Sequence, residues 1–98
     1  MAANVRVTGG ERAHREAFRE RVRWLLVRDP DAPAYEDRHD GDTLDYAFAA
    51  GGIPFPAFVD ASRAFGALRV EAEYPANGPH AAGRVVFQGG MVVEKVDF

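Results

Sequence analysis

The chain has 98 residues, enough for one domain with a single hydrophobic core but too few for two. Hydrophobic residues make up 47% and charged residues 28%, which is typical of a folded globular protein and not of a disordered one. The absence of cysteine excludes disulfides, thiolate nucleophiles and cysteine-bound metals. We therefore expect residues 1–98 to form a single domain that is stabilised by packing.

Charge and hydropathy also restrict the location and the partners. The net charge of −3 argues against general nucleic-acid binding, because phosphate neutralisation supplies most non-specific affinity. No apolar run approaches the roughly 20 residues that cross a bilayer, so we expect a cytoplasmic protein without membrane contact. Arginines concentrate in residues 12–28 and acidic residues in 29–42, and we expect these two segments to neutralise each other.

The spacing of apolar residues changes three times along the first half of the chain. Residues 3–8 alternate apolar and polar side chains, which predicts a half-buried strand. In residues 11–27 apolar side chains recur at helical spacing, which predicts a helix. Residues 28–42 contain two prolines and are polar, acidic and aperiodic, so we expect a long loop. Alternation returns in residues 43–49, which predicts a second strand.

The second half predicts one helix and three strands. After a connection stiffened by prolines, residues 57–65 carry an apolar helical stripe. Residues 68–74 alternate apolar with charged side chains, the pattern of a half-buried strand. Residues 83–88 and 91–98 predict a β-hairpin that turns at Gly89-Gly90.

The register of this hairpin has two alternatives. A two-residue loop would place Arg84 opposite Lys95, which is a like-charge pair. A three-residue loop would place Arg84 opposite Glu94. Because directly opposed like charges destabilise an antiparallel pair, we favour the longer loop.

The order of these elements predicts an α+β fold that is close to the ferredoxin-like plan. In this plan two helices lie on one face of a mixed, mostly antiparallel sheet, and a C-terminal β-hairpin extends it. A complete ferredoxin-like unit has a hairpin between its first helix and its third strand. The segment 28–42 would therefore have to hold a short, atypical strand around residues 33–37.

From Tyr46 onward, just over half of the chain resembles a family of ferredoxin-like domains typified by plasmid-borne YubB proteins. The matching residues are Pro54, Pro56, residues 62–66 (Ser-Arg-Ala-Phe-Gly), residues 71–74 (Glu-Ala-Glu-Tyr), Gly78, residues 82–84 (Ala-Gly-Arg) and residues 89–92 (Gly-Gly-Met-Val). The family carries a tryptophan before the proline-containing connection and an acid after the strand's tyrosine. This chain has Ala-Ala-Gly-Gly at 49–52 and Pro75-Ala76 there. The resemblance implies a ferredoxin-like fold and, since the family has no established activity, no function.

Residues that carry catalysis or bind metals show no convergent pattern. The run from Asp37 to Asp42 lacks the spacing of a calcium loop, so we expect it to be solvated. His14, on the apolar side of its helix, is expected to be a packed or boundary residue and not a ligand, and His80 is expected to face solvent in a turn. Ser62, the only serine, lacks a nucleophile-elbow sequence. We predict no catalytic residue, no metal site and no cofactor, and we do not favour an enzymatic role.

An alternative hypothesis is a small-molecule or enzymatic site between the acidic segment 28–42 and the sheet. Its polar groups would be Glu71, Glu73, Tyr74 and Arg84. The strand aromatics alternate in phase with aliphatic residues, so we expect them in the core and not as stacking platforms for RNA.

The leading hypothesis is a non-enzymatic binding module that forms a homodimer through its sheet or hairpin, or contacts an unknown protein partner. The hairpin has apolar residues on both faces, and the two helices can cover only one face. The predicted interface residues are Val86, Val92, Val96 and Phe98. The opposing possibility is that the segment 28–42 or the chain end covers this second face.

Overall fold

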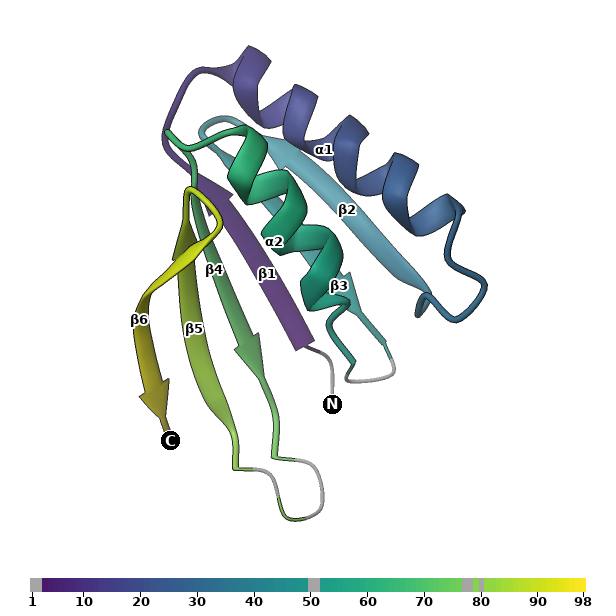
Figure 1. Cartoon of the computed structure of the whole chain (residues 1–98), viewed down its shortest axis with the longest axis vertical. Helices are drawn as coiled ribbons and strands as arrows, with labels where there is room; N and C mark the ends of the chain where they lie inside the picture. Colours follow the sequence, from purple (N-terminus) through teal and green to yellow (C-terminus); the bar gives the residue numbers. More distant parts are fainter. Residues whose placement is uncertain (1–2, 50–51, 77–78, 80) are drawn as a thin grey trace.

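The computed structural model describes residues 3–49, 52–76, 79 and 81–98, which form six strands and two helices (Figure 1). In chain order these are β1 (Ala3–Thr8), α1 (Arg12–Val27), β2 (Tyr35–Asp40), β3 (Thr43–Phe48), α2 (Phe55–Ala64), β4 (Arg69–Tyr74), β5 (Gly83–Gln88) and β6 (Met91–Asp97). The strands form one sheet in the order β2-β3-β1-β4-β5-β6, and every neighbouring pair is antiparallel. The fold is α+β and compatible with the ferredoxin-like plan, whereas the expectation of a mixed sheet is wrong.

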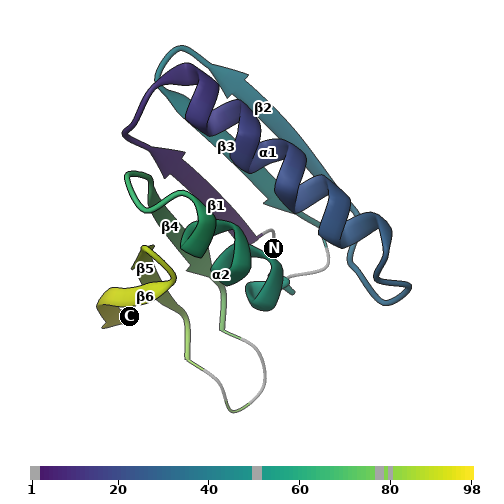
Figure 2. The same ribbon diagram turned by 45° about the horizontal axis from the view of Figure 1, so that its top comes forward.

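The hydrophobic core lies between one face of the sheet and both helices. Alternation along β1 and β3 turns Val5, Tyr46 and Phe48 towards the helices, where all three are buried. Phe18 of α1 and Phe58 of α2 fill the space above them. The Phe58 ring meets those of Tyr46 and Phe48 edge-on, at centroid distances of 5.0 and 5.8 Å. Figure 2 shows both helices on this side of the sheet.

The segment 28–42 contains β2, so the prediction of a loop throughout is wrong. The atypical strand required by the ferredoxin-like plan is present, but at Tyr35–Asp40 instead of residues 33–37. Its half-buried side chains alternate as Tyr35, Asp37 and His39, and the residues between them face solvent. Burial therefore alternates along β2 with a period of two. Hydropathy does not alternate, because two of the three inward side chains are polar.

The β5–β6 hairpin follows neither of the two predicted registers. Its loop is the two-residue Gly89-Gly90 turn, in which both glycines have positive φ, so the favoured three-residue loop is wrong. The register then shifts at a β-bulge that leaves Val93 without an opposing residue. Arg84 therefore lies opposite Val96, and the like-charge contact of the simple two-residue register does not arise.

The hairpin turn is attached to the end of α2. The hydroxyl of the buried Ser62 accepts a hydrogen bond from the Gly90 N–H, with an oxygen to nitrogen distance of 3.0 Å. A Cβ added at Gly90 would lie 2.8 Å from the Arg63 side chain. Ser62 and the glycine turn thus fix where the β5–β6 hairpin sits relative to α2.

Candidate functional site

The face of the sheet opposite the helices, called here the open face, is charged and largely paired within itself. Arg6 Nε donates to Asp45 at 2.8 Å, and this hydrogen bond and the carboxylate charge raise the pKa of Arg6. Arg84 donates to Glu71 at 3.2 Å and to Glu94 at 3.0 Å. A shallow hollow of about 680 Å³ lies on this face, over β2, β3, β1 and β4.

The structure separates the four residues predicted for a small-molecule site. Glu71 and Glu73 lie on the open face and line the hollow. Arg84 is on the same face, but it pairs with Glu71 and Glu94 and does not line the hollow. Tyr74 packs on the helix side, where its ring lies 6.1 Å from that of Phe55. Tyr74 therefore cannot act together with the two glutamates. The segment 28–42 lines the hollow only through β2, as part of the sheet and not as a loop that faces it.

The four predicted interface residues differ in exposure. Val86 lies on the open face but is 0% exposed, because its cross-strand neighbours Glu71 and Glu94 are bridged above it by Arg84. The prediction that Val86 contacts a partner is therefore wrong. Val96 is partly buried, whereas Val92 is 56% and Phe98 is 67% exposed.

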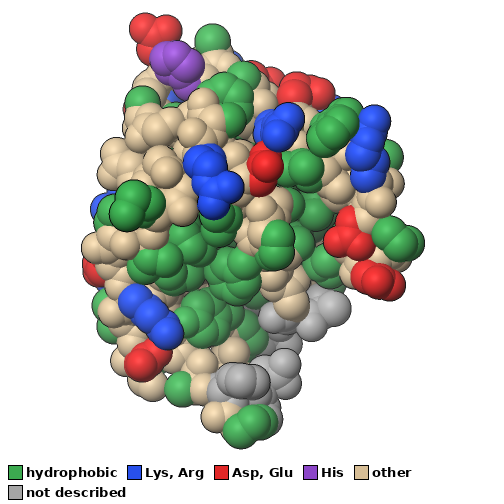
Figure 3. Space-filling model, in the orientation of Figure 1, with side chains coloured by type: hydrophobic (Ala, Val, Ile, Leu, Met, Phe, Trp, Pro, Cys, Tyr) green, Lys and Arg blue, Asp and Glu red, His purple; other side chains and the backbone are tan. Residues whose placement is uncertain are grey.

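The β6 edge of the sheet carries most of the exposed apolar surface. Met91, Val92 and Val93 are all exposed, and Phe98 follows directly after the strand. On the helix side, α2 packs on β4 and β5. Figure 3 shows hydrophobic side chains gathered over the lower part of α2 and the neighbouring β5. β6, one of the two edge strands of the sheet, therefore has an exposed apolar surface.

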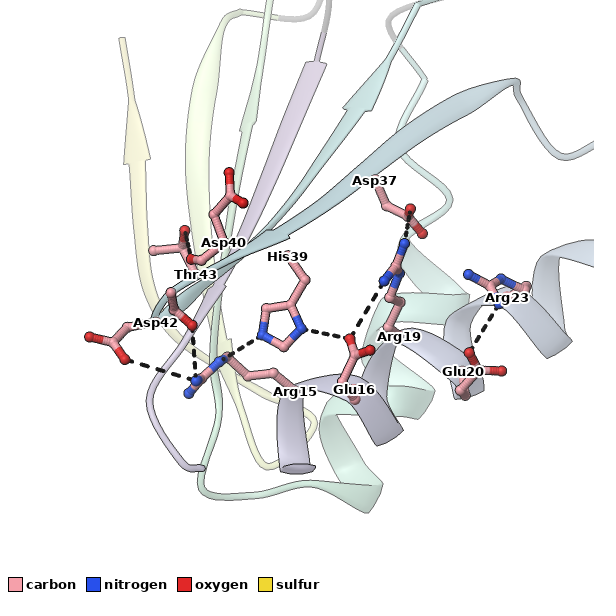
Figure 4. A network of polar contacts seen from close by, with 11 residues as sticks. Arg15, Glu16, Arg19, Glu20, Arg23, Asp37, His39, Asp40, Asp42 and Thr43 are labelled. Atoms are coloured by element: carbon pink, nitrogen blue, oxygen red, sulfur yellow. Dashed lines mark hydrogen bonds and ion pairs between the residues drawn. The ribbon is translucent and has the colours of Figure 1, made fainter. Parts of the chain in front are cut away.

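At the opposite edge, a buried arginine joins α1 to the ends of β1 and β2 (Figure 4). The Arg15 side chain is only 5% exposed. Its guanidinium donates to the carbonyls of Gly9 and Gly10, at 2.7 and 3.1 Å, and to that of Gly41 at 3.4 Å. These hydrogen bonds satisfy a buried cation and three carbonyl groups at once.

Arg15 also fixes the tautomer of His39, whose side chain is 2% exposed. Arg15 Nε donates to His39 Nε2 at 3.2 Å, so Nδ1 carries the proton and donates to Glu16 at 2.6 Å. This hydrogen bond lowers the pKa of Glu16. Beside it Arg19 pairs with Asp37 at 2.8 Å, which raises the pKa of Arg19. We call these five residues the α1–β2 polar network, and the burial of His39 makes it a structural attachment and not a reaction centre.

The sequence analysis missed Arg15 and His39, although one signal was present. Arg15 stands three and seven residues before Phe18 and Val22, so it occupies the apolar stripe of the helix. An arginine in that position indicates a buried cation with partners on a neighbouring element. The partner His39 lies on β2, the strand that hydropathy did not predict.

Two further arginines of α1, and Arg28 directly after the helix, are engaged individually. Arg21 pairs with Asp60 of α2 at 2.8 Å, and Arg23 pairs with Glu20 at 3.0 Å. The guanidinium of Arg28 lies 3.9 Å from the centre of the exposed Trp24 ring. Neutralisation by the segment 29–42 is limited to Arg15, near Asp42, and Arg19.

The remaining candidates for chemistry do not converge. His14 is exposed and accepts a hydrogen bond from the Glu11 N–H at 3.1 Å, so of the two expected positions, packed or boundary, it does not take the packed one. His80 lies outside the described residues. Within the described part of the chain, no three or more acidic or histidine side chains are grouped to hold a metal ion. No helix in that part has the length and apolar character needed to cross a membrane.

Comparison of the chain with protein-family models, with curated proteins and with solved structures finds no match. The resemblance to the YubB family therefore stays a prediction, and a function has to be argued from the surfaces described above.

Proposed function

We propose that the chain is a cytoplasmic, ferredoxin-like interaction domain without catalytic activity, which associates with a second copy of itself through the β6 edge. The observation that carries this proposal is the exposed apolar surface of an edge strand, around Val92 and Phe98. An exposed edge accepts a further strand through backbone hydrogen bonds, and apolar side chains then add buried area. An unrelated protein that offers an extended segment would use the same edge.

The direction of the β6 backbone groups supports strand addition. The Phe98 N–H donates to the carbonyl of Ala82, which precedes β5, at 2.9 Å. Backbone groups alternate in direction along a strand, so those of Val96 also point towards β5. Those of Lys95 and Asp97 point away from the sheet, where an added strand would meet them.

A proline at residue 95 tests the proposal, because it removes one outward N–H without removing a hydrogen bond to β5. We expect the mass of the wild type, followed by light scattering, to rise towards that of a dimer as its concentration increases. Lys95→Pro should weaken this association by about tenfold or more, which corresponds to about 1.4 kcal/mol. Lys95→Ala is the matched control, since it keeps the N–H, and it should weaken association less. A dimer that Lys95→Pro leaves unchanged would refute the β6 edge as the interface.

A second candidate is a small-molecule site in the hollow of the open face. It is favoured by Glu36 and Glu73, which line the hollow and form no ion pair with a described residue. Such a site would suit a small cationic or strongly hydrogen-bonding molecule. A compound that raises the melting temperature of the wild type but not of Glu73→Gln would support this function. A metabolite screen without such a compound would count against it.

A further inference from the structure

We propose that the second copy pairs with β6 in one register, antiparallel and two-fold symmetric, with Val96 opposite Val96 of the second copy. This inference rests on the proposed function and adds to it the contacts that select the partner. Lys95 of each copy would then lie opposite Asp97 of the other.

The β-bulge limits the part of the edge that can pair regularly. It interrupts alternation at Val93, so regular β6 geometry extends from Glu94 to Asp97, where the strand ends. Within this stretch Lys95 and Asp97 lie on the helix side of the sheet, since they pair with Val85 and Gly83. Glu94, Val96 and Phe98 alternate with them on the open face. A partner strand has only this short stretch with which to align.

Symmetry then restricts the register. Two identical antiparallel strands in one sheet are related by a two-fold axis perpendicular to it, so one residue must face its own copy. An axis at Glu94, Lys95 or Asp97 would oppose two like charges. An axis at Phe98 would lie outside β6, which ends at Asp97. Only an axis at Val96 avoids both defects.

The Val96 register also pairs charges that have no partner within the described part of the chain. The ion pairs near β6 join Arg69 and Arg84 to Glu94 and leave out Lys95 and Asp97. In the proposed dimer Lys95 of one copy and Asp97 of the second copy form an opposite-charge pair, and the two-fold symmetry gives a second, identical pair. Their backbone groups point outward, so each pair also exchanges both backbone hydrogen bonds.

Apolar contacts lie at the centre of the same arrangement. The two Val96 side chains meet at the axis on the open face, and Phe98 of each copy lies diagonally across from them. Phe98 also stands opposite Glu94 of the second copy, whose charge is already paired with Arg84. The exposed Phe98 ring is thereby covered without burying an unpaired charge.

Charge exchange between two variants tests this register. In Lys95→Asp both facing positions are acidic, and in Asp97→Lys both are basic, so each variant alone should dimerise about tenfold or more weakly than the wild type. Mixed in equal amounts, the two variants restore opposite charges at every facing position. We expect the mixture to form a heterodimer with an affinity within about threefold of the wild type.

Disulfide trapping gives a second measurement, because the chain has no cysteine of its own. A Val96→Cys pair at the axis would have Cα atoms about 4.5 Å apart, within the range that a disulfide spans. Val96→Cys should therefore cross-link at least about tenfold faster under mild oxidation than Val92→Cys, which is exposed but out of register.

Failure of the register and failure of the proposed function give different results. One outcome would overturn the register and keep the β6 edge as the interface. In it Lys95→Pro disrupts the dimer, but mixing the two charge variants does not restore affinity and Val96→Cys does not cross-link faster than Val92→Cys. A wild type that stays monomeric at several hundred micromolar, a concentration at which even a weak specific contact of about 0.1 mM would be populated, would overturn both.

Discussion

The two edges of the sheet differ in what protects them. Every second side chain of β2 is charged and exposed, and its inward side chains are held by α1 through Arg15 and Arg19. β6 has no such helix, and its exposed side chains include Met91, Val92 and Val93. Charge and cover keep an edge from pairing with another chain, whereas an apolar edge invites pairing. The proposed association is therefore placed at β6, because charged side chains protect the β2 edge from a further strand and the β6 edge lacks that protection.

The largest effect is expected from removing the arginine that attaches α1 to the β2 edge. Arg15→Ala should lower the free energy of unfolding by about 3 kcal/mol, because it leaves the buried His39 ring and three backbone carbonyls without a donor and empties a buried position of the helix. Urea denaturation measures the change. Arg12→Ala, at the exposed start of the same helix, should stay within about 0.5 kcal/mol of the wild type. A loss below about 1 kcal/mol for Arg15→Ala would show that the polar network does not hold this edge.

A matched pair of truncations sharpens the comparison on the β6 side. Val86→Ala should lower the free energy of unfolding by about 2 kcal/mol, since the side chain is fully buried on the open face. Val92→Ala makes the same chemical change on an exposed side chain and should cost less than about 0.5 kcal/mol. Measurements at low protein concentration keep association out of both values. Equal losses would contradict the assignment of Val86 to the interior and Val92 to the surface.

A smaller, opposite effect is expected near the β2 edge, where the buried Tyr46 hydroxyl has no hydrogen-bond partner among the described residues. Tyr46→Phe should raise the free energy of unfolding by up to about 1 kcal/mol. Burial raises the pKa of Tyr46, so above pH 10 its proton is lost more readily from the unfolded chain, and stability falls as the pH rises. This alkaline loss should be smaller in Tyr46→Phe, as thermal unfolding between pH 8 and about 11 can show. A lower stability of the variant at pH 7 would mean that the hydroxyl does have a partner.

The smallest effect concerns Glu16, whose pKa is lowered by the hydrogen bond from His39. A lowered pKa contributes stability above the unfolded value of about 4.5, and this contribution disappears as the pH falls through the folded value. Stability should therefore fall less steeply below pH 4.5 in Glu16→Gln than in the wild type. Glu36→Gln, on the solvent side of β2, is the control. Identical acid profiles for Glu16→Gln and the wild type would show that the His39 contact is too weak to matter.

Hydropathy predicted the elements whose buried face is apolar and missed the one whose buried face is polar. The strands at residues 3–8, 43–49 and 83–88 were predicted to within a residue, because their inward positions are Val, Leu, Tyr or Phe. β2 was missed because its inward residues Asp37 and His39 are polar and pack against charged side chains of α1. The hydropathy of one segment does not show that its polar residues have partners on another element.

The candidate site could be predicted in part. Alternation along β4 already places Glu71 and Glu73 on one face of the sheet and Tyr74 on the other, so the sequence alone argued against grouping these three residues in one site. The burial of Val86 was not predictable, since it depends on Arg84 lying across two strands. The bulge at Val93 was also hidden, because it changes the register without changing the composition of the hairpin.

The central place of β1 has a consequence for how the chain folds. β1 is hydrogen-bonded on both sides, to β3 and to β4, and both partners follow it in the chain after an intervening helix. Its pairing therefore requires closure of long chain segments, which slows folding relative to helical domains of the same size. On the ribosome β1 cannot be paired on both sides before Tyr74, the end of β4, has emerged.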